Sequence, residues 1–329
     1  MHDVRRAGFV LPGHGNDVRP APPARFNAGM DLPTGLTSRP LTPDDARAVF
    51  EVAAAQEQHD VGKVEIELAD IVGDWQRPSF DVGACTVGVF DGDAMVAYAE
   101  ITSVGRGDAA VHPSYRRRGL GTTLAGWMQQ RTRELGGSVI GSPVPEGSAG
   151  DRLLEKLGYR VRWTSWVLAL PEGREIQDRA LPDGYAIRAA GPEDYPAVQD
   201  VIEDAFLEWS VREREPYDDF LASTVQWPGF EPWHFRVVTD ASGAIVGCAL
   251  VIMAGDPATE AYIERLAVRR DQRHQGLAQA LLVDAFARGR EHGAVRSALS
   301  TDSRTGALSL YQKVGMEVGD VWVNRAIDV

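Results

Sequence analysis

The 329-residue sequence contains only two cysteines, Cys85 and Cys248, and each lies in an apolar, strand-like stretch. One thiol in each half offers neither a disulfide framework nor a metal-ligand spacing, so both are expected to be buried and free. The seven histidines are scattered without the short spacings that zinc sites use. The sequence therefore predicts a protein without metal, in a reducing compartment that we take to be the cytoplasm.

Long hydrophobic runs are also missing, since no apolar stretch approaches the roughly 18 residues that span a bilayer. The apolar residues 7–11 are too few for a signal peptide and are followed by Pro12. Residues 1–29 are rich in Pro, Gly, Arg and Asn and show no periodicity, so residues 1–35 are expected to form a disordered extension, with Met30 as an alternative start. We expect no membrane partner.

Positive charge is in deficit, because 34 Lys and Arg stand against 47 Asp and Glu and give a net charge of -13. A protein that binds nucleic acid or an anionic membrane over a broad surface would need a basic face. We therefore expect no nucleic-acid partner, although Arg116, Arg117 and Arg118 form one local basic segment. Hydrophobic residues at 44% and charged residues at 25% are ordinary for a globular protein long enough for two domains.

The chain repeats itself. Arg39, Pro43 and Asp45 recur 149 positions later as Arg188, Pro192 and Asp194. Further along, Arg116, Gly119 and Gly158 recur 157 positions later as Arg273, Gly276 and Gly315. Matches in the same order, with one net insertion in the second copy, indicate an internal duplication. We expect domains at residues 36–170 and 185–329, joined by a polar linker bounded by prolines at residues 171–184.

Both halves predict the same order of elements. Two helical segments come first, at residues 51–71 and 198–224, and a strand pair with an Asp91-Gly92 or Ser242-Gly243 turn follows. A third strand then leads through a basic, Gly-containing turn into a long helix. A strand, a short helix (residues 152–157 and 307–314) and a last strand complete each half.

The basic turns, Arg116-Arg-Arg-Gly119-Leu-Gly121 and Arg273-His-Gln-Gly276-Leu-Ala278, are the most informative feature. Backbone N–H groups that open a helix have no intrahelical partner, and the helix dipole adds partial positive charge there. Small residues let a phosphate approach these groups, and the leading arginine can add charge at the mouth. One such turn is often ordinary strand-to-helix packing, but two copies in matching contexts favour an anion-binding cradle.

Other phosphate and catalytic motifs fit poorly. A dinucleotide fingerprint would need a third small residue, where Leu124 stands in the first copy, and an acidic residue that closes the next strand. The Gly-Lys-Ser/Thr of a Walker loop and the Gly-x-Ser-x-Gly elbow of hydrolases are both absent from the sequence.

The two turns resemble the acyl-CoA motif of the GNAT superfamily of N-acetyltransferases, Gln/Arg-x-x-Gly-x-Gly/Ala. The segment Ala307-Leu-Ser-Leu-Tyr311-Gln-Lys-Val-Gly315-Met316 is similar to the C-terminal signature of that superfamily. The resemblance covers residues 36–329 as two units, an arrangement similar to that of mycothiol synthases. It implies an α/β (α+β) fold: two GNAT folds in tandem, each with a mixed, splayed central sheet flanked by helices.

The resemblance also implies which residues contact acetyl-CoA. The strand before each turn would bind the pantetheine arm through its backbone, and the turn would bind the pyrophosphate. In the second copy these residues are Leu266, Ala267, Val268, Arg273, His274, Gln275, Gly276, Leu277 and Ala278, together with Ser303. In the first copy they are Ala109, Ala110, Val111, Arg116, Arg117, Arg118, Gly119, Leu120 and Gly121.

Tyr311 matches the family position whose hydroxyl protonates the departing CoA thiolate. On its own, a tyrosine on a short helix is equally typical of packing. The first copy has Leu154 at this position and has no proton to give. We therefore expect the chemistry in the C-terminal domain and a catalytically degenerate N-terminal domain.

Glu264, four residues before Val268, is the candidate base, although a solvent-facing residue or an ion pair with Arg265 would explain it equally well. Asp302, His234 and Glu208 are weaker candidates. An acidic run in the second helical region either attracts a cationic amine or forms a solvated face. It comprises Glu203, Asp204, Glu208, Glu213 and Glu215.

The function predicted is acetyl transfer from acetyl-CoA to the primary amine of a small molecule by direct attack. A non-catalytic acyl-CoA sensor or scaffold and a protein or peptide N-acetyltransferase are the alternatives. The internal duplication is compatible with a monomer that forms its own pseudo-dimer, or with a homodimer.

Overall fold

The computed structural model describes residues 30–329 with the exception of residues 104, 211 and 256. Of the disordered extension expected at residues 1–35, residues 1–29 lie outside the described part. The prediction is wrong for its end, because Met30 and Leu32 pack against the core of the N-terminal unit. The described chain divides into two compact units. The N-terminal unit contains residues 30–163 and 322–329, and the C-terminal unit contains residues 164–321.

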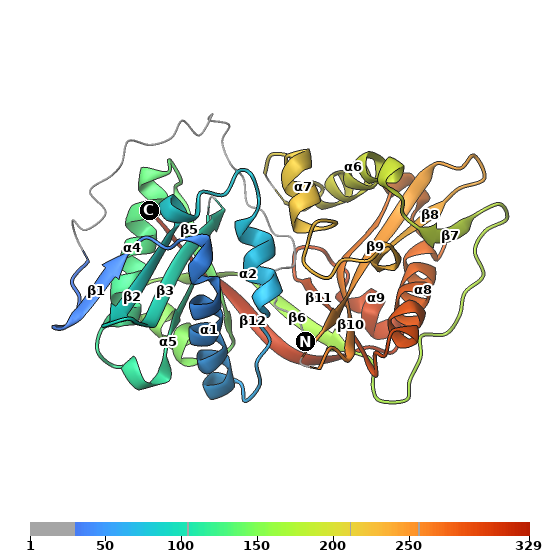
Figure 1. The fold of residues 1–329 in the computed structure, drawn as a ribbon. Helices are drawn as coiled ribbons and strands as arrows, with labels where there is room; N and C mark the ends of the chain where they lie inside the picture. The colour runs from blue at the N-terminus through green and yellow to red at the C-terminus, as the bar shows by residue number, and fades with distance from the viewer. Residues whose placement is uncertain (1–29, 104, 211, 256) are drawn as a thin grey trace. The chain divides into compact units, whose positions relative to one another are not determined.

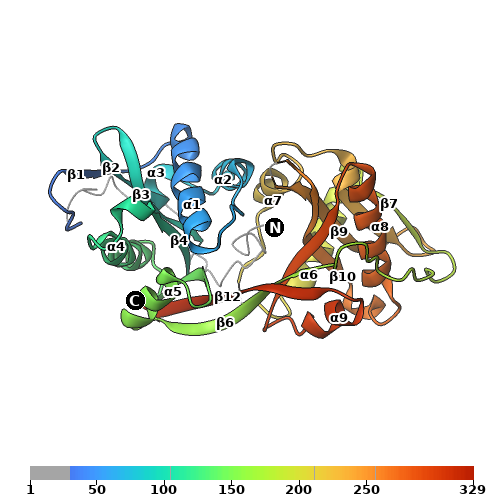
Figure 2. The same cartoon turned by 90° about the horizontal axis from the view of Figure 1, so that it is seen from below.

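The N-terminal unit holds one mixed sheet in the order β1-β2-β3-β4-β5-β12. All neighbouring strands are antiparallel except β4 and β5, which are parallel. Helices α1 and α2 cover one face of this sheet, and α4 and α5 cover the other (Figure 2). In chain order, the helices and strands of the first copy are β1 (Leu36–Arg39), α1 (Ala46–Asp60), α2 (Leu68–Trp75), α3 (Val82–Cys85), β2 (Thr86–Asp91), β3 (Ala94–Ser103), β4 (Arg106–Val111), α4 (Leu120–Glu134), β5 (Val139–Pro145), α5 (Ala149–Lys156) and β6 (Arg160–Ala169).

The C-terminal unit repeats this plan with a sheet in the order β7-β8-β9-β10-β11-β6, in which only β10 and β11 are parallel. Helices α6 and α7 lie on one face, and α8 and α9 lie on the other (Figure 1). In chain order, the helices and strands of the second copy are β7 (Ala186–Ala189), α6 (Tyr195–Phe206), α7 (Tyr217–Ser223), β8 (Phe235–Thr239), β9 (Ile245–Ala254), β10 (Glu260–Val268), α8 (Leu277–Glu291), β11 (Arg296–Asp302), α9 (Leu308–Lys313) and β12 (Glu317–Asp328).

The duplication read from the sequence appears in the structure as a repeated ion pair. Arg39 donates two hydrogen bonds to Asp45, at 2.7 and 2.8 Å, and Arg188 donates two to Asp194, at 2.5 and 2.8 Å. Each aspartate also accepts the backbone N–H three residues before it, at 2.8 Å. Because such a bidentate pair requires a fixed geometry, it holds the first strand against the start of the first helix in both units. The Arg39 guanidinium lowers the pKa of Asp45 to about 2.

The units differ from the expected domains, 36–170 and 185–329, in their last strands. Residues Ser165–Ala169 of β6 pair with Asp302–Ala298 of β11, in the sheet of the C-terminal unit. Residues Trp322–Asp328 of β12 pair with Pro145–Val139 of β5, in the sheet of the N-terminal unit. Each sheet is therefore completed by the last strand of the other copy, an arrangement that hydrophobic periodicity along the chain does not reveal.

The mixed, splayed sheets flanked by helices confirm the predicted fold class, and the predicted helices and hairpins lie close to the observed ones. The short strands β1 and β7 and the single-turn helix α3 were not predicted, because four residues carry too little periodicity. No helix in the described part of the chain is long and apolar enough to cross a membrane.

Candidate acyl-CoA site

The central strand of the C-terminal unit has one edge that is only half paired. Its parallel ladder with β11 runs from Glu260 to Ile263 and ends there, whereas its antiparallel ladder with β9 continues to Val268. The register with β9 shifts between Ile263 and Arg265, so Glu264 is the extra residue of a β-bulge. A bulge disrupts the local ladder and bends the strand. The sheet therefore opens beyond Glu264.

The alternation of backbone groups decides what the open edge presents. The N–H of Arg269 donates to the carbonyl of Val246 on β9 at 2.9 Å. Since successive N–H groups in a strand point to opposite edges, those of Leu266 and Val268 point away from β9, toward the opening. No side chain of the described residues binds the N–H of Val268.

The turn after β10 has the conformation of an anion-binding loop. His274 and Gly276 both have positive φ, at 66° and 85°. The first copy matches this with Arg117 at 62° and Gly119 at 91°. A left-handed residue other than glycine is strained and such residues gather at functional sites, and alternating left- and right-handed residues turn consecutive N–H groups toward one point. Helices α4 and α8 then begin at Leu120 and Leu277.

The arginines that lead the turns are each paired with a carboxylate. Arg273 donates to both carboxylate oxygens of Glu208, at 2.7 and 2.8 Å, and to the carbonyl of Val268 at 3.1 Å. In the first copy Arg116 pairs with Asp60 at 2.6 and 2.7 Å. Each guanidinium is thus held by a carboxylate just after or at the end of the first helix. The pairs fix the position of the turn and neutralise the leading arginine of each copy.

Tyr311 lies on α9 and is almost fully buried in the core that also contains Leu281 and Phe286. Burial raises the pKa of its phenol to about 12. Its hydroxyl makes no hydrogen bond to another described residue. A phenol in this state stays protonated and has a proton to give. Leu154, its counterpart, is buried in the core of the N-terminal unit.

Glu264 is half-buried at the bulge. An ion pair with Arg265 does not explain it, because Arg265 contacts Glu215 at 3.3 Å and Ser223 at 3.5 Å. The weaker base candidates are all engaged elsewhere. Asp302 is held by Arg304, Glu208 by Arg273, and the Nδ1 atom of His234 by the backbone of Glu231. Burial also lowers the pKa of His234.

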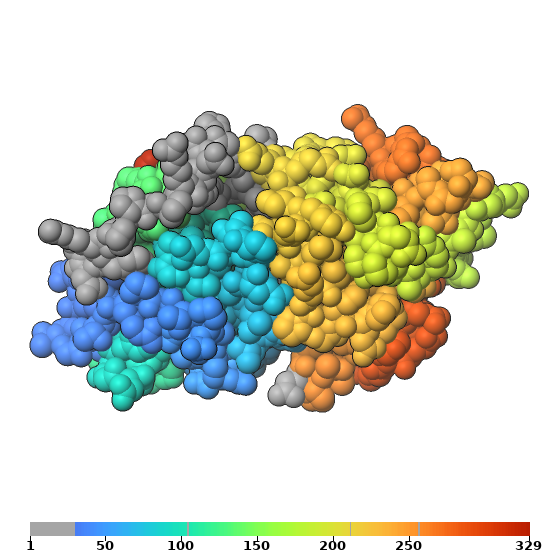
Figure 3. Space-filling view, turned by 45° about the horizontal axis from the view of Figure 1, so that its top comes forward, coloured from blue at the N-terminus to red at the C-terminus, as the bar shows by residue number. Residues whose placement is uncertain are grey.

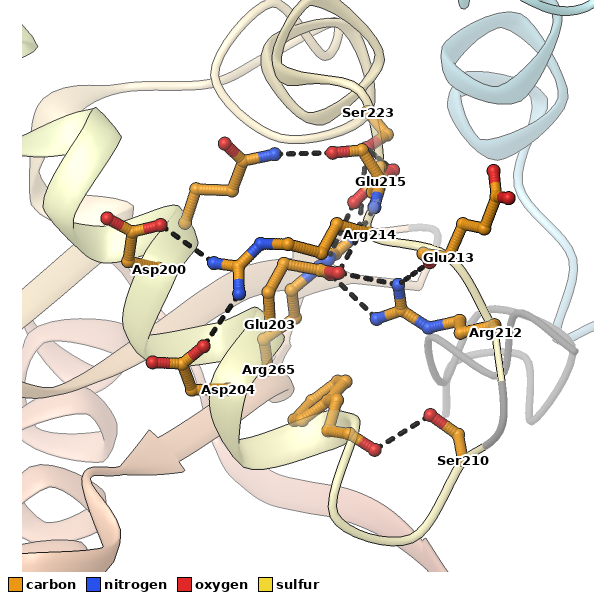
Figure 4. Close-up of polar contacts among 12 residues, drawn as sticks. Asp200, Glu203, Asp204, Ser210, Arg212, Glu213, Arg214, Glu215, Ser223 and Arg265 are labelled. Carbon is orange, nitrogen blue, oxygen red and sulfur yellow. Dashed lines mark hydrogen bonds and ion pairs between the residues drawn. The ribbon is translucent and has the colours of Figure 1, made fainter. Parts of the chain in front are cut away.

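The acidic run around α6 is occupied by arginines (Figure 4). Glu203 accepts two hydrogen bonds from Arg212, both at 2.6 Å, and both side chains are almost completely buried. Arg214 forms ion pairs with Asp200 at 2.7 Å and with Asp204 at 2.6 Å, and all three side chains are exposed. The part of the chain around Arg214 is coloured yellow on the surface in Figure 3. These pairs hold the α6–α7 connection in place, and within the run the exposed Glu213 carboxylate is the one without a partner among the described residues.

The N-terminal unit opens its sheet in the same way, because β4 pairs with β5 only at Arg106 and Gly141. The edge is nevertheless occupied there. The side-chain Oε1 atom of Gln56 on α1 accepts the N–H of Val111 at 3.0 Å, and Val111 is the counterpart of Val268. This contact was not anticipated, because nothing in the local sequence connects residues 56 and 111.

Two further expectations concern Ser303 and the two cysteines. The N–H of Ser303 donates to the carbonyl of Thr164 at 2.9 Å, and its hydroxyl accepts the N–H of Thr164 at 3.3 Å. Its contact with CoA stays a prediction. Both cysteine thiols are free, and burial raises their pKa values to about 11 for Cys85 and about 12 for Cys248. Neither is a nucleophile at neutral pH. Within the described residues, no group of His, Cys, Asp and Glu is placed to hold a metal ion.

Comparison with known proteins agrees with this geometry. The model of the acetyltransferase (GNAT) family matches residues 196–316, and that of the FR47-like proteins matches residues 86–167. A mycothiol acetyltransferase of Salinispora arenicola is 30% identical over 256 residues, which cover 73% of this chain and 80% of that protein. This chain is an acetyltransferase of the GNAT family. It carries two GNAT-like regions and is homologous to mycothiol acetyltransferases.

Solved structures extend the family assignment to the whole architecture. A GCN5-related N-acetyltransferase from Sphaerobacter thermophilus superposes with a TM-score of 0.70 at 27% identity, covering 90% of this chain and 96% of that one. A tandem GNAT protein from the clavulanic acid biosynthesis pathway superposes with a TM-score of 0.67 at 17% identity, covering 89% and 98%. The tandem arrangement of two GNAT folds is therefore shared with solved members of the family.

The buried pair of Glu203 and Arg212 gives a test of the structural role of the acidic run. Arg212→Ala leaves a buried carboxylate without its partner, which is expected to lower the free energy of unfolding by about 3–5 kcal/mol. Arg214→Ala removes an exposed pair and is expected to cost less than about 1 kcal/mol. Urea unfolding followed by circular dichroism measures both. Equal losses for the two variants would contradict the assignment.

Proposed function

We propose that this chain transfers the acetyl group of acetyl-CoA to a primary amine of a small molecule, and that the chemistry takes place in the C-terminal unit. One observation carries the proposal. The opened edge of β10, between the bulge at Glu264 and the turn at Gly276, presents an N–H of Val268 that no described side chain binds, whereas the equivalent N–H of Val111 is occupied by Gln56.

The residues present fit acetyl-CoA at this edge. An extended pantetheine arm would pair with the outward backbone groups of Leu266 and Val268, as an added strand pairs with a sheet edge. The diphosphate would bind the N–H groups of residues 274–278, because the left-handed residues and the start of α8 point them outward. When bound, acetyl-CoA supplies the thioester that the amine attacks.

Three groups of the protein would then serve the reaction. An outward N–H of β10 would donate to the thioester carbonyl as this gains negative charge. Glu264, at the point where the sheet opens, would accept a proton from the ammonium group of the acceptor, directly or through water, and the free amine would then attack the thioester. The Tyr311 hydroxyl would donate its proton to the thiolate that leaves, and its raised pKa keeps that proton available.

The N-terminal unit has an anion-binding turn but differs from the C-terminal unit at positions proposed for catalysis. Gln56 blocks the thioester end of its open edge, and Leu154 replaces the acid. We propose that this unit is catalytically degenerate. A small-molecule acceptor is supported by the relatives, which carry the name mycothiol acetyltransferase. The pairing of Glu203 and Asp204 with arginines reduces the attraction of the acidic run for a strongly cationic acceptor.

Tyr311→Phe is expected to lower kcat about 100-fold, because it removes the proton donor. The Kd for CoA should stay within about two-fold, since the substitution keeps the ring in the core and removes only the hydroxyl. Release of CoA thiol with a panel of amines measures kcat, and calorimetry measures Kd. Because the pKa of Tyr311 is about 12, kcat of the native protein should not fall on the alkaline side below about pH 10.

Tyr159→Phe is the matched control, since it removes another buried phenolic hydroxyl, one that interacts with Gln129 in the N-terminal unit. Its kcat should equal that of the native protein. Full activity of Tyr311→Phe would exclude the acid role. Tight CoA binding by the native protein without thiol release across the whole amine panel would establish a sensor in place of an enzyme.

Glu264→Gln tests the base. The variant is expected to lower kcat/KM about 100-fold near pH 7, where the acceptor is an ammonium ion and must lose a proton. The deficit should shrink as the pH approaches the pKa of the acceptor amine, because free amine then needs no base. A deficit that is constant from about pH 7 to pH 10 would show that Glu264 only positions groups.

A further inference from the structure

The segment at residues 171–184 is fixed to the C-terminal unit along its length. Ile176 is buried in the core that α8 covers. The side-chain Nε2 of Gln279, in the first turn of α8, donates to the carbonyl of Gln177 at 2.7 Å. Glu175 pairs with Arg290 near the other end of the same helix at 3.3 Å. The expected linker therefore forms a strap along α8, and it reaches the start of that helix near residue 177.

The strap places one cation directly on the anion-binding turn. A Cβ atom added to Gly276 would lie 2.5 Å from Cδ and 2.8 Å from Cζ of Arg179, so the guanidinium packs on the bare Cα of Gly276. The Arg179 side chain is exposed. Within the described part of the chain it has no carboxylate partner, and only its backbone N–H is engaged, with the Asp178 side chain at 2.8 Å.

Two arginines near Arg179 in the structure are paired with carboxylates, unlike Arg179. Arg273 is neutralised by Glu208, and Arg269 pairs with Asp271 at 2.9 Å. In the first copy no described residue apart from its chain neighbours lies within 4 Å of a Cβ added to Gly119, and the cations beside it, Arg117 and Arg118, belong to the turn itself. The two cradles thus share a backbone conformation, and Arg179 distinguishes the second from the first.

We propose that Arg179 is a binding residue for the diphosphate of acyl-CoA, brought to the cradle by the strap. The inference rests on the proposed function. A guanidinium presents several N–H donors in one plane and binds phosphate oxygens in pairs, so it supplements the backbone N–H groups of residues 274–278. Gly276 is then required for a second reason besides its positive φ, because any side chain there would displace Arg179.

The test compares Arg179→Ala and Arg179→Lys with Arg174→Ala, an exposed arginine of the same strap. Calorimetry in low salt gives Kd values for CoA, 3′-dephospho-CoA and pantetheine. Arg179→Ala is expected to weaken CoA and 3′-dephospho-CoA alike, by about ten-fold, and to leave pantetheine unchanged. Arg179→Lys should lose less, and Arg174→Ala should match the native protein. The melting temperature should be the same for all four proteins.

Other outcomes overturn the inference in distinguishable ways. Equal weakening of pantetheine would mean that Arg179 only shapes the strap. Weakening of CoA alone would assign it to the 3′-phosphate, and unchanged or tighter CoA binding would make it a spectator or a plug. If the native protein binds CoA and releases thiol while Arg179→Ala is unaffected, only this inference fails. If the native protein binds no CoA, the proposed function fails with it.

Discussion

The structure depends on the early end of the parallel hydrogen-bond ladder between β10 and β11. A backbone N–H in a sheet needs a partner, and β10 gives up its partner strand after Ile263 while it continues to Val268. The bulge at Glu264 makes this separation possible, and the turn at residues 273–278 follows directly. A strand edge, a candidate base and an anion-binding turn are therefore placed along one continuous backbone. The pair of Arg273 and Glu208 holds the turn in place.

Duplication supplied two copies of this frame, and their differences lie in a few side chains. The first copy keeps the left-handed turn and the splayed strands but directs Gln56 at Val111 and has Leu154 in place of a tyrosine. The second copy leaves Val268 open and places Arg179 on the turn. The two units therefore differ in the side chains at equivalent backbone positions, and their shared fold alone does not distinguish them.

The order of strands, turns and helices in each copy could be predicted from the sequence, because Gly276 and Gly119 precede strongly periodic helices and because the two copies show the same pattern. The pairing of residues far apart in the sequence could not be predicted. The exchange of β6 and β12 between the sheets, the Arg273–Glu208 pair and the filling of the acidic run by Arg212 and Arg214 each join residues whose contact no local pattern encodes. Ser303 and the leading arginines are predicted at the ligand, and the structure adds contacts of each within the protein that the sequence does not indicate.

We propose that acyl-CoA binds along the open edge of β10, and a crystal structure of the chain with CoA would test this. We expect the diphosphate on the N–H groups of residues 274–278, with Arg179 in contact. The pantetheine arm should lie along Leu266 and Val268, with the sulfur near the Tyr311 hydroxyl. Electron density for CoA only at residues 117–121 of the first copy, with the edge of β10 empty, would contradict it.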